Sequence, residues 1–106
     1  MSIRTREGRH YLLKEKSEEL RFSTDEKICI ILIINEYSIR KISIILHYSE
    51  SYIDVLIASV KKKFNAKRRE KVIAEAIFHG IITNEMCSHF KRNHSIPLLI
   101  ETFFKN

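Results

Sequence analysis

The sequence predicts an all-α protein with a single domain. Two Gly and one Pro among 106 residues are too few turn formers for a sheet-rich fold, and they favour helices joined by short polar connections. Apolar residues make up 44% of the chain, which at this length supports one modest hydrophobic core. Apolar positions recur at helical spacing, most clearly along Ile53, Ile57 (or Leu56), Val60 and Phe64. One helical domain around one core therefore fits the composition.

The first well-marked helix is expected over residues 24–35. Ser23 is suited to the N-cap position, and Glu26 three residues later gives the spacing of a capping box. The unbroken apolar run Ile28–Ile34 follows at once. Residues 1–21 are expected to be a partly helical N-terminal extension, in which a weakly amphipathic helix covers His10 to Leu20.

Two further helices are expected close together in the middle of the chain. Ser38 is expected to cap a helix over Ile39–Leu46, and Ser49 a helix that ends near Phe64. Only two or three residues separate them, so the pair forms a helix-turn-helix pattern. In such a pattern the second helix is free to lie in the major groove of DNA.

The last third of the chain is expected to continue in helices. A fourth helix over about Glu70–His79 should stop at Gly80, because glycine suits the left-handed position after a helix end. The apolar residues of 83–106 predict one or two more helices that pack on the domain or on a second subunit. Pro97 suits the first turn of the last helix, where its missing N–H costs nothing.

The positive charge is concentrated in one segment. Seven basic residues and one acidic residue lie between positions 61 and 71, and this excess equals the net charge of +6 of the whole chain. Such a segment favours contact with an anionic polymer. The alternative is an ordinary solvated helix end, since lysines also suit the negative end of a helix dipole.

Several motifs between residues 22 and 82 keep the spacing of a known family without a gap. They are Phe22-Ser23-x-x-Glu26, Ser38-x-x-x-Ile42, Leu46-x-x-Ser49-Glu50-x-x-Ile53, Lys63-Phe64, Arg69 with Ala74, and Ala76-x-x-x-Gly80-Ile81-Ile82. Through these motifs the segment 22–82 resembles the LuxR/GerE family of helix-turn-helix transcriptional regulators.

The resemblance implies a four-helix helix-turn-helix domain, here with additional N-terminal and C-terminal helices. In that family the third helix reads double-stranded DNA and the fourth forms a dimer contact, so the chain is expected to be a homodimeric transcriptional regulator. The resemblance implies no cofactor. It places the dimer contact at Ile73, Ala74, Ile77 and Phe78.

The residues expected to contact DNA fall into two groups. Side chains along the third helix would face the bases, and basic side chains around it would hold the phosphate backbone. The first group is Ser51, Tyr52, Asp54, Val55, Ser59 and Lys62. The second group is Arg40, Lys61, Lys62, Lys63, Lys67, Arg68 and Arg69.

The departures from the family pattern lie where DNA would be read. Asp54 and Ala58 stand where basic residues are usual, and Leu56 stands where the family has a polar residue. Glu36 and His47 replace two glycines beside the second helix. An alternative function follows, in which the chain is a protein-interaction module that binds another transcription regulator and has weakened or lost DNA binding.

Other classes of function have little support in the sequence. Cys87, His89 and His94 are too loosely spaced for a good zinc site, and no nucleophile stands with a base and an orienting acid. We therefore expect neither an enzyme nor a metal protein. The longest apolar run has seven residues, far below the roughly 20 of a membrane span, and two unpaired cysteines suit a reducing cytoplasm.

Overall fold

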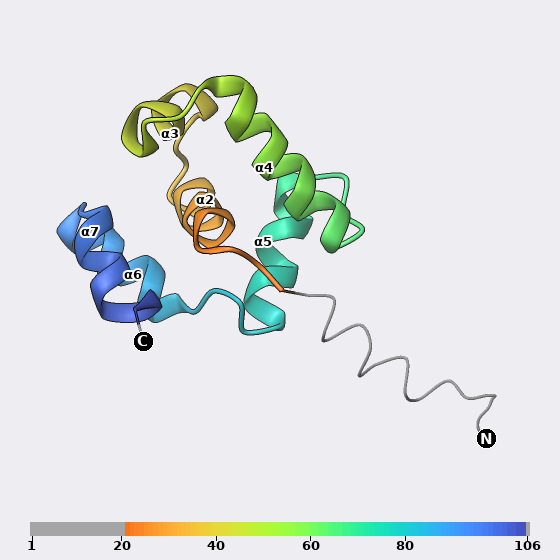
Figure 1. The fold of residues 1–106 in the computed structure, drawn as a ribbon. Helices are drawn as coiled ribbons and strands as arrows, with labels where there is room; N and C mark the ends of the chain where they lie inside the picture. Colours follow the sequence, from red (N-terminus) through yellow and green to blue (C-terminus); the bar gives the residue numbers. More distant parts are fainter. Residues whose placement is uncertain (1–20, 106) are drawn as a thin grey trace, which may run out of the picture.

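The computed structural model describes residues 21–105, and this part of the chain is helical, with no β-strand (Figure 1). The predicted all-α class is confirmed. The helix predicted over residues 10–20 lies outside the described residues. The elements are α2 (Thr24–Ile34), α3 (Ile39–Leu46), α4 (Glu50–Lys63), α5 (Arg69–Phe78), α6 (Asn84–Asn93), α7 (Ile96–Leu99) and the π-helical turn η1 (Ile100–Phe104).

Helix α2 is the centre of the domain. Its segment Ile28–Ile33 is buried on every side, which is unusual for a helix of a small protein and means that neighbours cover its whole circumference. Helices α4, α5 and α6 pack against it, and Figure 1 shows α2 between α5 and α6. The apolar run in the sequence therefore becomes the middle of the core.

Helices α3 and α4 meet at a tight turn beside the start of α2 (Figure 1). Each of the three predicted N-caps forms its hydrogen bond: Ser23 Oγ accepts from the Glu26 N–H, Ser38 Oγ from the Lys41 N–H and Ser49 Oγ from the Tyr52 N–H. These bonds satisfy N–H groups that a helix start leaves without partners. The caps therefore set where the two helices of the pattern begin.

The ends of α2 and α3 share one geometry. Glu36 and His47 have φ values of 68° and 61°, in the left-handed region that favours glycine. At both ends the following amide closes the turn, since the Tyr37 N–H donates to the Leu32 carbonyl and the Tyr48 N–H to the Ser43 carbonyl at 3.0 Å each. The two positions where the LuxR/GerE pattern has glycine are therefore positions with positive φ here.

Replacing Glu36 with Gly is expected to raise the free energy of unfolding by about 0.5–1 kcal/mol. The exchange removes the steric cost of a left-handed Cβ, and the greater freedom of glycine in the unfolded chain offsets only part of this gain. Urea unfolding followed by circular dichroism measures the change. Asn65→Gly is the matched control, because asparagine tolerates its φ of 53° and should gain less. Equal gains at both positions would contradict the strain at Glu36.

The segment after Gly80 folds back onto α2. Gly80 has a φ of 71° directly after the end of α5, as the sequence predicts. Phe90 of α6 is buried and meets the Tyr37 ring edge-on at 5.9 Å, and Lys27 of α2 lies 5.6 Å from the Phe104 ring. Pro97 occupies the first turn of α7. Residues 83–105 thus cover the side of α2 away from α4 and α5.

Candidate nucleic-acid interface

Helix α4 has two faces with different roles. Its inward face places Ile53, Leu56, Ile57 and Val60 in the core. The predicted core stripe is confirmed, and Leu56 is only 7% exposed, so it is not available for reading DNA. The outward face of α4 consists of exposed side chains that are not part of the hydrophobic core: Ser51, Tyr52, Asp54, Val55, Ala58 and Lys62.

An ion pair between the buried Glu26 and the partly exposed Lys63 joins α4 to the start of α2. The Lys63 Nζ lies 2.8 Å from Glu26 Oε1 and 3.0 Å from Oε2, and it also donates to the Arg21 carbonyl at 2.9 Å. The Ser59 hydroxyl donates to Glu26 Oε2 at 2.8 Å, and the Ser23 N–H donates to Oε1 at 2.8 Å. The Lys63 ammonium also lies 5.0 Å from the Phe22 ring. Glu26 is therefore held by donors from both helices.

This network lowers the pKa of Glu26. Burial alone would raise it, but the hydrogen bonds from Lys63, the Ser23 N–H and Ser59 outweigh the burial and keep the carboxylate charged. The side chains of Ser59 and Lys63 are thereby committed to the interior contact with α2. Both residues were predicted from the sequence to contact DNA. Because their side chains bind Glu26, we do not include them in the candidate interface.

A second contact fixes the turn between α3 and α4. The Tyr48 hydroxyl donates to Asp25 Oδ2 at 2.8 Å, which raises the pKa of Tyr48, and the Tyr48 and Tyr52 rings meet edge-on at 4.7 Å. This group was not among the contacts expected from the sequence. No local signal links Asp25 to Tyr48, because 23 residues separate the two. The contact orients the start of α4 with respect to α2.

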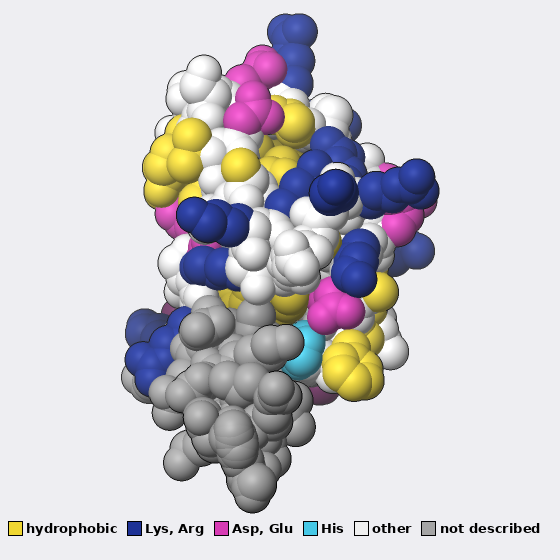
Figure 2. All heavy atoms as spheres, turned by 90° about the vertical axis from the view of Figure 1, so that its right-hand side faces the viewer, with side chains coloured by type: hydrophobic (Ala, Val, Ile, Leu, Met, Phe, Trp, Pro, Cys, Tyr) yellow, Lys and Arg dark blue, Asp and Glu magenta, His cyan; other side chains and the backbone are white. Residues whose placement is uncertain are grey.

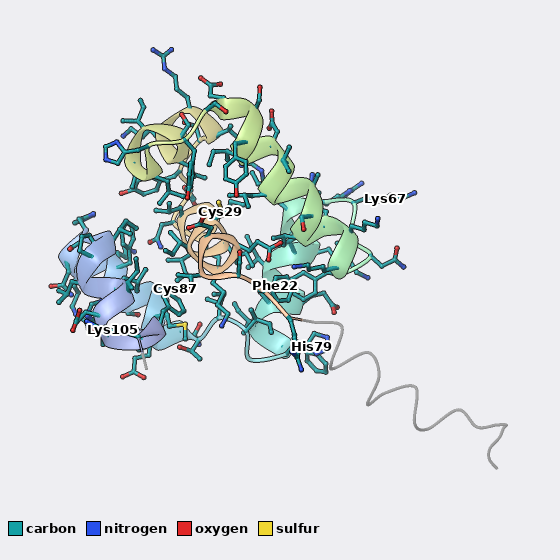
Figure 3. All side chains as sticks on the ribbon, viewed as in Figure 1. Phe22, Cys29, Lys67, His79, Cys87 and Lys105 are labelled. Atoms are coloured by element: carbon teal, nitrogen blue, oxygen red, sulfur yellow. The ribbon has the colours of Figure 1, made fainter. Side chains whose placement is uncertain are left out.

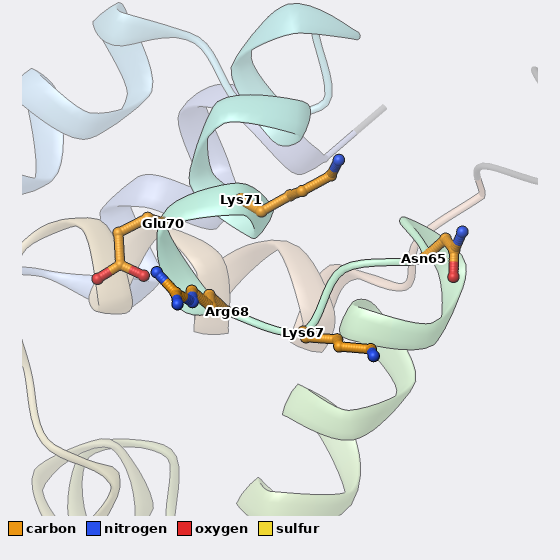
Figure 4. A pocket seen from close by; sticks show the side chains of 5 residues that line it. All are labelled: Asn65, Lys67, Arg68, Glu70 and Lys71. Carbon is orange, nitrogen blue, oxygen red and sulfur yellow. The ribbon is translucent and has the colours of Figure 1, made fainter.

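The basic loop is defined by Lys67 and Arg68 of the connection between α4 and α5, together with Lys71 in the first turn of α5. With Asn65 and Glu70 these residues line an open hollow beside the N-terminus of α5 (Figure 4). In that view Lys67 and Lys71 extend to one side, and Arg68 and Glu70 to the other. The first turn of α5 has no side-chain cap, so its N–H groups add to the positive potential.

Positive side chains spread over the face of the molecule that carries α4 and α5. Figure 2 looks onto this face and shows Lys and Arg side chains across it with a few acidic ones between them. Lys67 projects outward from the loop (Figure 3). Most of the predicted DNA contacts are exposed, namely Arg40, Ser51, Tyr52, Asp54, Val55, Lys62, Lys67, Arg68 and Arg69, whereas Lys61 is half-buried.

The predicted dimer residues lie on the outer side of α5. Phe78 is 82% exposed, Ile77 and Ala74 are also exposed, and Ile73 is half-buried against the core. The Phe78 ring meets the His79 ring edge-on at 5.1 Å and otherwise faces outward. A large aromatic side chain with this exposure costs free energy in water unless a second surface covers it.

We searched residues 21–105 for metal-binding groups, reactive thiols and membrane-spanning helices. Within 21–105, no group of three or more His, Cys, Asp or Glu side chains is placed to hold a metal ion. Burial raises the pKa of Cys29 to about 12 and also raises that of Cys87, so both thiols are poor nucleophiles at neutral pH. In the same part of the chain no helix has the length and hydropathy to cross a bilayer.

Comparison of the chain with models of protein families, with curated proteins and with solved structures finds no match.

Proposed function

We propose that this chain is a DNA-binding transcriptional regulator that places α4 in the major groove. The observation that carries the proposal is the outward face of α4, which stays open to solvent along the helix while the inward face forms the core. In helix-turn-helix proteins, the helix that enters the major groove of DNA follows a tight turn and packs against its own domain on one face only. The shared positive-φ turns at Glu36 and His47 support the resemblance to LuxR/GerE regulators.

The proposal assigns the basic side chains around α4 to contacts with the DNA phosphates. Helix α4 has 14 residues and is about 21 Å long, so its first half can reach base edges while its end lies near a phosphate strand. Lys62 at that end, with Lys67 and Arg68 of the basic loop, would hold one phosphate strand, and Arg40 of α3 would hold the opposite strand. Such contacts supply affinity without sequence information.

A duplex titration at several salt concentrations tests this proposal. We expect a fluorescently labelled duplex of about 30 base pairs to bind at low salt, and the affinity to fall with a log–log slope of roughly −3 to −4 per protomer. This slope corresponds to about four phosphate contacts, at Arg40, Lys62, Lys67 and Arg68. Fluorescence anisotropy gives the affinity at each salt concentration. Absence of binding even at about 50 mM salt would contradict the proposal.

We propose further that α5 pairs two copies of the chain through the exposed side chains of Ala74, Ile77 and Phe78. Phe78→Glu is then expected to convert a dimer to a monomer, because it places a charge in an apolar contact. Sedimentation equilibrium measures the mass of both proteins. Leu98→Glu is the control, since Leu98 is an exposed apolar residue on α7. A wild-type chain that sediments as a monomer, or a Phe78→Glu dimer, would contradict this pairing.

The second candidate function is the protein-interaction module. Two exposed aliphatic side chains favour it, Ile44 on α3 at 62% and Val55 on α4 at 60%, because apolar surface beside a helix-turn-helix also suits a protein partner. Asp54 adds an acid where phosphates would repel it. The same titration separates the two functions, since a module of this kind would leave the duplex unbound at low salt.

A further inference from the structure

The first half of α4 presents a short row of side chains that form no hydrogen bond or ion pair through their side chains with any other residue of 21–105. Ser51, Asp54, Val55 and Ala58 are all exposed and follow the three- and four-residue spacing of one helix face. Ser51 and Ala58 are about 10 Å apart along the axis, which corresponds to about three base pairs. This row is therefore the part of α4 that can meet base edges.

The chemistry of this row is unusual for DNA recognition. The segment 50–60 contains no Arg, Lys, Asn or Gln. The side chains that commonly read guanine and adenine through paired hydrogen bonds are therefore missing. What remains in the row is the Ser51 hydroxyl, which can donate or accept on any base, one carboxylate, Asp54, which can only accept hydrogen bonds, and the apolar groups of Val55 and Ala58. Among residues 21–105 no cation forms an ion pair with Asp54, so its carboxylate is free to find a donor.

In the major groove, one kind of base edge suits the Asp54 carboxylate and another suits the Val55 side chain. A carboxylate needs an amino group, and cytosine presents one without an acceptor on the same base edge, whereas adenine presents its amino group next to a ring nitrogen that repels a carboxylate. An exposed valine suits the methyl group of thymine. Residues 54 and 55 are neighbours in sequence, so they would meet neighbouring base pairs.

We infer that α4 reads a pyrimidine pair, in which Asp54 accepts from the amino group of a cytosine and Val55 packs on the methyl group of a neighbouring thymine; this rests on the proposed function. Asp54 then acts mainly by weakening the binding of sequences that lack this cytosine. The phosphates repel its charge on every sequence, and only a cytosine at the matching position supplies a hydrogen bond that offsets the repulsion. Asp54 thus raises the ratio of specific to non-specific affinity more than it raises the affinity itself.

Selection of bound duplexes from a randomised pool tests the role of Asp54. The wild-type chain is expected to select a cytosine at one fixed position of each half-site. Asp54→Asn is expected to replace this preference by adenine, because a carboxamide pairs with the amino group and ring nitrogen of adenine together. The preferred base should change by roughly ten-fold in relative affinity. A cytosine preference that survives in Asp54→Asn would overturn the role of Asp54.

The role of Val55 is tested by removing one methyl group from the selected duplex. Replacing the contacted thymine by uracil should weaken binding of the wild-type chain about four-fold and leave Val55→Ser, which has no methyl group to pack on the base, unaffected. Ile44→Ala is the matched control, since Ile44 is equally exposed but lies on α3, and this variant should lose affinity as the wild type does. An equal loss in Val55→Ser and wild type would overturn the contact.

Two outcomes separate this inference from the proposed function. A wild-type chain that binds duplexes with a clear salt dependence but enriches no sequence from the pool would overturn the pyrimidine contact and leave DNA binding intact. A chain that binds no duplex at low salt would overturn both.

Discussion

Replacing Lys63 with Met is expected to destabilise the folded chain by about 2–3 kcal/mol at pH 7. The substitution leaves the Glu26 carboxylate, only 5% exposed, without its cationic partner, which costs more than the ion pair gains. The expected loss of stability is smaller than for a fully buried ion pair, because 31% of the Lys63 side chain is exposed and water screens its charge. Urea unfolding measures the difference in free energy.

The cost of Lys63→Met should fall in acid. The folded-state pKa of Glu26 lies below its ordinary value, so its contribution to stability is complete above about pH 4.5 and is lost as the pH falls through the lower folded-state pKa. In Lys63→Met the burial of Glu26 raises its pKa, and protonation relieves the unpaired charge. The two proteins should therefore approach each other in stability as the pH falls through the raised pKa of Glu26 in the variant and then through its lowered pKa in the wild type.

Lys62→Met is the matched control for this experiment. Lys62 is the exposed neighbour of Lys63 on the outward face of α4, and its replacement should change stability by less than about 0.5 kcal/mol. The same variant should weaken duplex binding, since Lys62 is one of the proposed phosphate contacts. Equal stability losses in the two variants would contradict the different roles given to these adjacent lysines.

Charge reversal of Lys62, Lys67 and Arg68 to Glu is expected to lower duplex affinity on the order of 1,000-fold at moderate salt. Under the proposed function, each change turns an attraction to a phosphate into a repulsion, and the log–log salt slope should become shallower by about three. The three side chains are exposed and form no ion pair with another residue of 21–105, so the helical circular dichroism signal should remain. Fluorescence anisotropy measures the affinity.

The control variant has the same net charge with the changes on the other side of the molecule. It carries Lys91→Glu, Arg92→Glu and Lys105→Glu on α6 and just after η1, far from Lys67 as Figure 3 shows for Lys105. Its duplex affinity should stay within about three-fold of wild type, because distant charges are screened at moderate salt. Equal losses in both triple variants would mean that binding follows total charge and not the basic loop.

The local features of the fold were predictable because each depends on residues close together in the chain. The serines at 23, 38 and 49 cap their helices by accepting a hydrogen bond from the amide three residues later. Gly80 follows the end of α5 because glycine readily adopts the positive φ needed there. The core stripe of α4 follows from helical spacing alone. Such signals need no knowledge of how the helices meet.

The inward contacts of α4 were not predictable in the same way. Ser59 and Lys63 stand beside the core stripe, where a side chain can turn either to water or to a neighbouring helix. Which of the two occurs depends on Glu26, 37 residues before Lys63. A basic run in a sequence therefore does not show which of its members is free. Here Lys62 is exposed and Lys63 is paired, although both have the same chemistry and adjacent positions.

The two faces of α4 have a consequence for how this protein can change over generations. Residues that hold the helix in place, such as Ile53 and Lys63, alternate along the chain with residues that touch only solvent, such as Asp54 and Val55. Substitutions of the second kind cost little stability. If α4 reads DNA as proposed, a lineage of such proteins can therefore change its target sequence one residue at a time while every intermediate stays folded.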